Sequence, residues 1–204
     1  MKDLLINSIM NNIKKYNNYD ESKLKIIRFG LASLYLQITK LFVIFTISYF
    51  LGTIETLLKL MAFYTLLRLV AFGVHAKRSI DCWIASLSTF LLLPYLCEII
   101  SIGLNIKIIA CSICILLISI YAPADTEKRP LIHKKKRIIY KVISIIISIL
   151  YLIIILKIDN SIISNCIMFG LCLSTFTILP ITYKLFGVRY NNYKYYKKEG
   201  KEIE

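Results

Sequence analysis

The sequence predicts an all-α, polytopic integral membrane protein with about six transmembrane helices and with both the N- and C-termini in the cytoplasm. Hydrophobic residues make up 57% of its 204 residues, the mean hydropathy is +0.67, and the net charge is still +14 at pH 7. A soluble chain of this length could not bury so much apolar surface. A membrane protein, in contrast, exposes apolar helices to the lipid bilayer and collects basic residues in cytoplasmic loops. Nucleic acid is not an expected partner, because nucleic-acid binding leaves the long apolar runs unexplained.

The apolar segments of the chain give the number of helices. A transmembrane helix needs about 20 mostly apolar residues. The candidate segments are residues 31–51, 53–72, 83–102, 106–121, 138–156 and 161–183. The second segment is the weakest, because Glu55, Lys59 and Arg68 interrupt it, and the fourth is a little short.

Basic residues give the orientation. They are concentrated before the first segment, between the fourth and fifth segments, and in the C-terminal tail. The connections near Thr53, Gly103 and Asp159 hold at most one basic residue each. This alternation predicts cytoplasmic termini. It also places the connection that contains His75 and Cys82 in the cytoplasm.

Three regions follow from this pattern. Residues 1–25 form an amphipathic or flexible N-terminal segment, in which Leu5, Ile9 and Ile13 recur at helical spacing. Residues 26–186 form the transmembrane domain, and residues 187–204 form a basic, tyrosine-rich cytoplasmic tail.

His75 and Cys82 are the first candidates for chemistry. The chain has only two histidines, and His75 lies seven residues before Cys82 at a predicted membrane edge. A thiol needs a base to become a good nucleophile at neutral pH, and imidazole is the usual base. Residues seven apart on a straight helix are separated by about 10.5 Å along the axis. A dyad therefore requires a break between the two residues, and Gly73 and the polar residues after His75 favour one.

The flanking residues have structural and functional interpretations. Arg68 is either a snorkelling residue at a helix end or an intramembrane charge with a functional role. After the fourth apolar segment, Pro123 and Pro130 stiffen a loop in which Lys128 and Arg129 present positive charge. Taken alone, this loop is an ordinary positively charged cytoplasmic loop.

Together these motifs resemble the accessory gene regulator protein B family, the AgrB-like peptidases of Gram-positive quorum sensing. The resemblance depends on Arg68, on Gly73-Val74-His75-Ala76, on Cys82, and on the loop from Ala122-Pro123 to Pro130 with its basic residues. It covers most of residues 25–190. The sequence departs from the family pattern at Glu127, where the family tends to have a basic residue, and at Phe72-Gly73, where a double glycine is common.

The resemblance implies a cysteine endopeptidase in a bacterial cell membrane, with the active site on the cytoplasmic side. Cys82 is then the nucleophile and His75 the general base. The substrate is a short quorum-sensing precursor peptide, which is cut near its acidic C-terminal tail and cyclised through a Cys82 thioester to a thiolactone or lactone autoinducing peptide. Arg68, Gly73, Lys128, Arg129 and Pro130 are expected to shape the site or bind the substrate. The family is also reported to act as a homodimer.

Two alternatives remain at this point. Charges inside the apolar segments could line the path of a small membrane peptide transporter, although the chain has no internal repeat. The chain could also be a non-catalytic membrane partner. The sequence gives no sign of a metal or cofactor, because the CxxC spacing of Cys111 and Cys114 lies inside an apolar run with no second pair.

Overall fold

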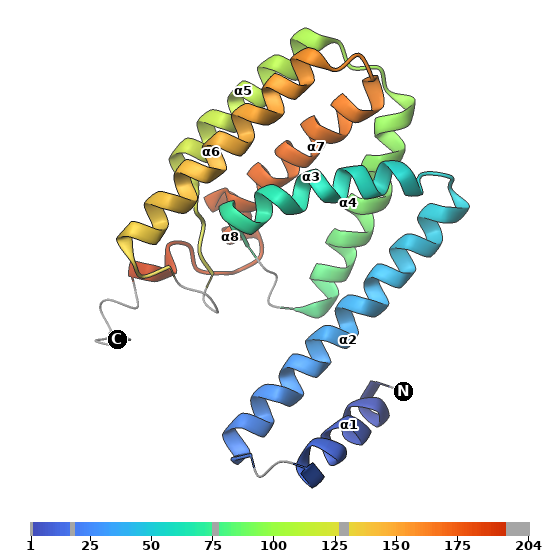
Figure 1. Ribbon diagram of the computed structural model, residues 1–204, viewed down its shortest axis with the longest axis vertical. Helices are drawn as coiled ribbons and strands as arrows, with labels where there is room; N and C mark the ends of the chain where they lie inside the picture. Colours follow the sequence, from blue (N-terminus) through green and yellow to red (C-terminus); the bar gives the residue numbers. More distant parts are fainter. Residues whose placement is uncertain (1, 17–18, 75–77, 127–130, 195–204) are drawn as a thin grey trace. The chain divides into compact units, whose positions relative to one another are not determined.

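The computed structural model describes residues 2–16, 19–74, 78–126 and 131–194, and these fold almost entirely into α-helices (Figure 1). The helices along the described chain are α1 (Lys2–Tyr16), α2 (Glu21–Phe50), α3 (Ile54–Ala71), α4 (Ser79–Ile99), α5 (Leu104–Tyr121), α6 (Lys134–Lys157), α7 (Ser161–Ile178) and α8 (Pro180–Leu185). The described residues contain no β-strand, and an isolated parallel bridge joins Phe72 and Ala124. The predicted all-α fold is confirmed.

The chain divides into two compact units, residues 1–47 and residues 48–204. In the first unit, Arg28 of α2 donates a hydrogen bond to the side chain of Asn7 on α1, at 3.2 Å. The Asp20 carboxylate accepts the backbone N–H of Glu21 at 2.9 Å and so caps the start of α2. α2 therefore begins well before residue 31, where the apolar segment was predicted to start. The first turns of α2 are polar and exposed, so apolar composition does not mark them.

The second unit is built around α7. In its most apolar stretch, α7 is 56% buried, whereas α4 is 11% buried. α7 also contacts α3, α4, α5, α6 and α8. A Cβ atom at Gly170 of α7 would lie 3.2 Å from the backbone nitrogen of Tyr64, so the absence of a side chain lets α7 approach α3 closely. The Tyr151 hydroxyl of α6 donates to the Phe63 carbonyl of α3 at 2.8 Å. α7 is thus the central helix of this unit.

The helices expose apolar side chains, as expected for contact with lipid. α6, for example, exposes Ile138, Ile146, Leu150 and Ile153. Five described helices are long and apolar enough to cross a membrane, namely α2, α4, α5, α6 and α7. The chain is therefore a multi-pass membrane protein by helix length and composition. α3 is the weakest of the predicted spans and is not among the five, so its crossing of the membrane stays a prediction.

The last predicted span, residues 161–183, is not one helix. α7 ends at Ile178, Leu179 is extended with φ −67° and ψ 141°, and α8 begins at Pro180. Proline disfavours the helical conformation of the preceding residue and has no N–H to continue the helix. The break turns Tyr183 inward, where its hydroxyl donates to the Ala124 carbonyl at 2.9 Å.

Candidate active site

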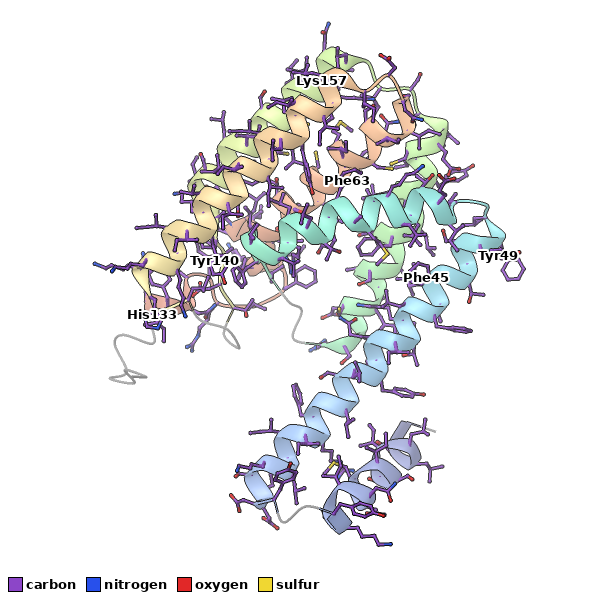
Figure 2. All side chains as sticks on the ribbon, in the orientation of Figure 1. Phe45, Tyr49, Phe63, His133, Tyr140 and Lys157 are labelled. Carbon is purple, nitrogen blue, oxygen red and sulfur yellow. The ribbon has the colours of Figure 1, made fainter. Side chains whose placement is uncertain are left out.

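The candidate site lies where several helix ends of the second unit meet. The turn after α3 is bonded to the loop after α5 and to the end of α7. The same loop contacts the first turn of α6 through Asp125 and Arg137. Tyr140, labelled on α6 in Figure 2, packs edge to face against Phe72, with 5.2 Å between the ring centroids. Residues from three helices and from the loop after α5 therefore surround the turn that precedes His75.

The turn itself has an unusual backbone. Phe72 has φ 60° and Gly73 has φ +123°, in a region that residues with side chains rarely adopt. The Gly73 N–H donates to the Ala124 carbonyl at 2.9 Å, and the Ala124 N–H donates to the Ala71 carbonyl at 3.0 Å. These two bonds form the parallel bridge and tie the turn to the loop that follows α5.

Arg68 holds the same turn from inside α3. Its guanidinium donates to the carbonyls of Phe72, at 2.8 Å, and Val74, and to the hydroxyl of Thr177 on α7. The Val74 N–H in turn donates to the Thr177 carbonyl at 2.9 Å. The guanidinium thus binds acceptors within the protein, and Arg68 is not a snorkelling residue in this structure.

Gly73 leaves no space for a side chain. A Cβ atom there would overlap the Arg68 guanidinium and lie 2.9 Å from the Thr177 carbonyl oxygen, which is backbone and cannot move aside easily. Both this crowding and the positive φ require glycine at this position. A larger residue would displace either the turn or Arg68.

Cys82 lies in the first turns of α4 and is half-buried. Its backbone N–H donates to the Arg78 carbonyl at 3.3 Å. Only four residues separate Val74 from Ser79, the first residue of α4, so the chain can span at most about 18 Å between them. The start of α4 is therefore confined to this distance from the turn that Arg68 holds. His75 lies outside the described residues.

The loop after α5 begins as a buried segment. Ala122, Pro123, Ala124 and Asp125 are all buried. Burial raises the pKa of the Asp125 carboxyl, while the Tyr193 N–H, the Arg137 guanidinium and the Leu131 N–H oppose the rise. The predicted substrate-binding residues Lys128, Arg129 and Pro130 lie outside the described residues.

The start of α6 is strongly basic. In Figure 2, His133 lies at the N-terminal end of α6. An open hollow of about 430 Å³ is lined by the exposed residues His133, Lys134, Lys135 and Lys136. An anionic group would be favoured here, because the lysine charges add to the partial positive charge of the helix N-terminus. Cys82 does not line this hollow. It also does not line an apolar groove beside α4, whose lining residues are Leu51, Leu87, Ser88, Leu91, Leu92 and Tyr95.

Sequence reasoning missed two residues of this region. Thr177 lies in an apolar run, 109 residues beyond Arg68, and nothing in the local sequence marks it as a partner of an arginine. Asp125 is one acidic residue in a charged loop, and its burial depends on the distant residues Tyr193 and Arg137. In both cases the partner comes from a different helix or from the tail.

The described residues contain no group of three His, Cys, Asp or Glu side chains that could hold a metal ion. The cysteines form no disulfide bonds. Cys82 is the only cysteine at this end of the described helices, because the other five lie farther along α4 or within α5 and α7.

Comparison with known proteins gives one family. The family model described as accessory gene regulator B matches residues 6–178. A putative AgrB-like protein of Clostridium acetobutylicum is 36% identical over 177 residues, which cover 86% of this chain and 84% of the relative. The accessory gene regulator protein B of Staphylococcus aureus strain Newman is 36% identical over 173 residues, or 83% of this chain and 88% of the relative. A putative AgrB-like protein of Listeria welshimeri is 30% identical over 199 residues, or 97% of this chain and 94% of the relative. No solved structure matches the chain.

Proposed function

Because the chain belongs to the accessory gene regulator B family, we propose that it is a membrane cysteine endopeptidase in which Cys82 is the nucleophile and His75 the general base. Membership of this family supports an accessory gene regulator role in quorum sensing. Within that role, the substrate is a short precursor peptide with an acidic C-terminal segment. The proposed location is a bacterial cell membrane, with the site on the cytoplasmic side and the enzyme acting as a homodimer.

The proposed reaction has two acyl transfers. His75 takes the proton of the Cys82 thiol, and the sulfur attacks the scissile carbonyl carbon of the precursor. The C–N bond breaks, the acidic C-terminal piece leaves as an amine with the proton from His75, and a thioester remains on Cys82. A thiol or hydroxyl within the bound precursor then attacks this thioester. It releases Cys82 and closes a thiolactone or lactone ring.

The position of Cys82 carries the proposal. It lies in the first turns of α4, beside the connection whose entry at Val74 is fixed by Arg68 and Thr177. Arg68 donates two hydrogen bonds to carbonyls of this turn and a third to the Thr177 hydroxyl of α7. A charged side chain placed in this way in a membrane protein is a candidate for a functional role. Such a fixed turn is what a catalytic base next in the chain requires, because a misplaced base loses most of its effect.

Ring closure requires that water does not reach the thioester first. One thioester replaces another in the thiolactone case, so the second step releases little free energy, and hydrolysis would compete with it. Gly73 and Val74 are buried, and the adjoining loop residues Ala124 and Asp125 are buried as well. A site at the edge of the bilayer beside these residues would limit the access of water.

The basic surface supplies the proposed substrate contact. Lys128, Arg129 and the exposed Lys134–Lys136 attract the acidic segment of the precursor, while Pro130 limits the freedom of the loop. Arg68 and Gly73 shape the site by holding the turn before His75.

A cleavage assay tests the proposal. The full chain is placed in lipid vesicles with a synthetic precursor that has an internal cysteine and an acidic C-terminal segment, and the products are followed by mass spectrometry. We expect the wild type to release the C-terminal fragment and to form a thioester on Cys82. Cys82→Ala and His75→Ala should release none. Cys172→Ala is the matched control, because Cys172 is also half-buried but lies within α7.

Two outcomes would contradict the proposal. Equal cleavage by the wild type and the Cys82→Ala variant would exclude Cys82 as the nucleophile. Uptake of the intact precursor into the vesicles by both proteins, without any fragment, would instead identify a peptide transporter.

A further inference from the structure

The Asp125 carboxyl group binds the C-terminal segment of the chain. Asp125 is fully buried, and its Oδ2 atom accepts the backbone N–H of Tyr193 at 2.8 Å and that of Leu131 at 3.3 Å. The Asp125 carbonyl oxygen accepts the Tyr183 hydroxyl at 3.1 Å and the Asn192 side-chain amide at 3.4 Å. One residue of the loop after α5 therefore connects to α8 and to the tail.

Arg137 adds a second contact to the same tail residue. Its guanidinium carbon lies 3.5 Å from the centre of the Tyr193 ring, and its Nη1 atom lies 3.8 Å from Asp125 Oδ2. Arg137 is thus directed inward, in contrast to the exposed Lys134, Lys135 and Lys136 just before it. Tyr193 is held both through its backbone and through its ring.

We propose that Asp125 is a positioning residue that anchors the segment of residues 189–194 beside the start of α6, and that the anchored segment extends the cationic surface that binds the acidic part of the precursor. The second half of this inference rests on the proposed peptidase function, whereas the anchor itself does not. Figure 1 shows the red C-terminal segment beside the first turn of α6.

The charges of the two segments support an acidic peptide as the partner. Arg189 and Lys194 are exposed, as are Lys134, Lys135 and Lys136 at the start of α6. The backbone carbonyl of Arg189 also accepts the Asn192 amide at 2.8 Å, which folds the segment on itself. Cations from two distant parts of the sequence are brought together here, and their fields add at the same surface. A flexible, extended acidic segment can contact both.

The anchor is tested by limited proteolysis of the full chain in vesicles of neutral lipid. The bond after Arg189 lies inside the anchored segment, and its cleavage by trypsin requires that the segment open. We expect Asp125→Ala to raise the rate of this cleavage about tenfold or more, because the side-chain acceptor of the Tyr193 and Leu131 N–H groups is lost. Asp125→Asn keeps an oxygen acceptor for the Tyr193 N–H and should stay close to the wild-type rate. Asp159→Ala, an exposed residue in the connection between α6 and α7, is the control.

Variants of Tyr193 keep the test informative even if the loss of Asp125 causes misfolding. Tyr193→Ala removes the ring that stacks on Arg137 and leaves the buried loop unchanged, while Tyr193→Phe keeps the ring. We expect faster cleavage after Arg189 for the alanine variant and the wild-type rate for the phenylalanine variant. Unchanged cleavage in both Asp125→Ala and Tyr193→Ala would overturn the anchor.

The role of the anchored segment in binding is tested with the precursor. Asp125→Ala, and the double variant Arg189→Gln, Lys194→Gln, should raise KM roughly threefold to tenfold with little change in kcat, as expected for the loss of exposed charge contacts. The increase should disappear at high salt. Faster cleavage after Arg189 without any change in KM would overturn the proposal that the anchored segment binds the precursor. If no protein cleaves the precursor, the peptidase proposal fails, while the proteolysis result still decides the anchor.

Discussion

The Arg68 guanidinium on α3 and the Thr177 hydroxyl on α7 form a hydrogen bond at the end of the helices where the chain turns toward His75 and Cys82. Thr177 also accepts the Val74 N–H through its carbonyl at 2.9 Å. One residue at the end of α7 therefore contacts both the side chain that holds the turn and the backbone of the turn. This double contact makes Thr177 a test of whether the turn matters for activity.

Thr177→Val should lower cleavage of the precursor about tenfold or more in kcat/KM. Valine keeps the shape of threonine but leaves one Arg68 donor without its acceptor, and hydrogen bonds to charged groups are worth about 1.5–3 kcal/mol. Thr175→Val is the control, because the Thr175 hydroxyl donates to the Leu171 carbonyl of its own helix at 2.8 Å. The assay is fragment release measured by mass spectrometry at equal protein levels. Equal loss in both variants would point to a general defect of α7.

Gly73→Ala should abolish cleavage while the protein still inserts into the membrane. The positive φ alone costs about 1–3 kcal/mol for a residue with a side chain, and the added Cβ would overlap Arg68. Gly103→Ala provides the comparison, since φ is −63° there and a Cβ would meet nothing within 4 Å. Membrane fractionation and the cleavage assay are run on both variants. Wild-type activity in Gly73→Ala would show that the turn tolerates displacement.

Neutralising the basic residues should weaken substrate binding in a salt-dependent way. Replacing Lys128 and Arg129, or Lys134–Lys136, by glutamine is expected to raise KM for the precursor roughly threefold to tenfold. Charge attraction is screened at high salt, where the Debye length falls to about 3 Å at 1 M. The variants and the wild type should therefore converge there. Lys157→Gln, at the other end of α6, is the control. A KM difference that persists at 1 M salt would argue against charge attraction.

The Asp125 carboxyl should make stability depend on pH. Its pKa is raised above the ordinary value of 3.8, chiefly by burial, so the folded protein binds this proton more tightly than the unfolded chain. The contribution of Asp125 to the free energy of unfolding is therefore largest at low pH and falls as pH rises from about 3.8 through the folded-state pKa. Asp125→Asn does not ionise and removes this dependence.

The measurement is thermal unfolding in detergent at several pH values, followed by the fluorescence of Trp83, the single tryptophan. Stability of the wild type relative to Asp125→Asn should decline with rising pH in this window and become constant above it. Asp159→Ala serves as a control for the general effect of pH. A relative stability that rises with pH would mean that the Arg137 contact outweighs burial.

The predicted spans largely coincide with helices, because long apolar runs with polar boundaries mark the middle of the chain. Residues 53–72 and 106–121 were predicted as spans, and α3 and α5 begin and end within two residues of those bounds. The predicted end of the last span was wrong. The apolar composition continues to Tyr183, but Pro180 breaks the helix. Composition detects burial in lipid, but a single proline decides where the helix stops.

The candidate site was predictable only in its local part. Gly73 could be expected in a turn, since glycine adopts positive φ without strain. The partners of Arg68 could not, because Thr177 is distant in sequence and its hydroxyl resembles many others in apolar helices. Likewise, the contact between Asp125 and Tyr193 depends on how the tail folds back, which no local pattern determines.

The close approach of α3 and α7 at Gly170 has a consequence for how the protein responds to its bilayer. Two helices packed backbone against backbone tilt together when the hydrocarbon thickness changes, so Arg68 and Thr177 keep their registration. α4 buries a much smaller share of its surface and is freer to tilt by itself. Lipids with shorter or longer acyl chains should therefore shift Cys82 relative to the turn that precedes His75. We therefore expect the proposed peptidase activity to depend on the acyl-chain length of the surrounding lipids.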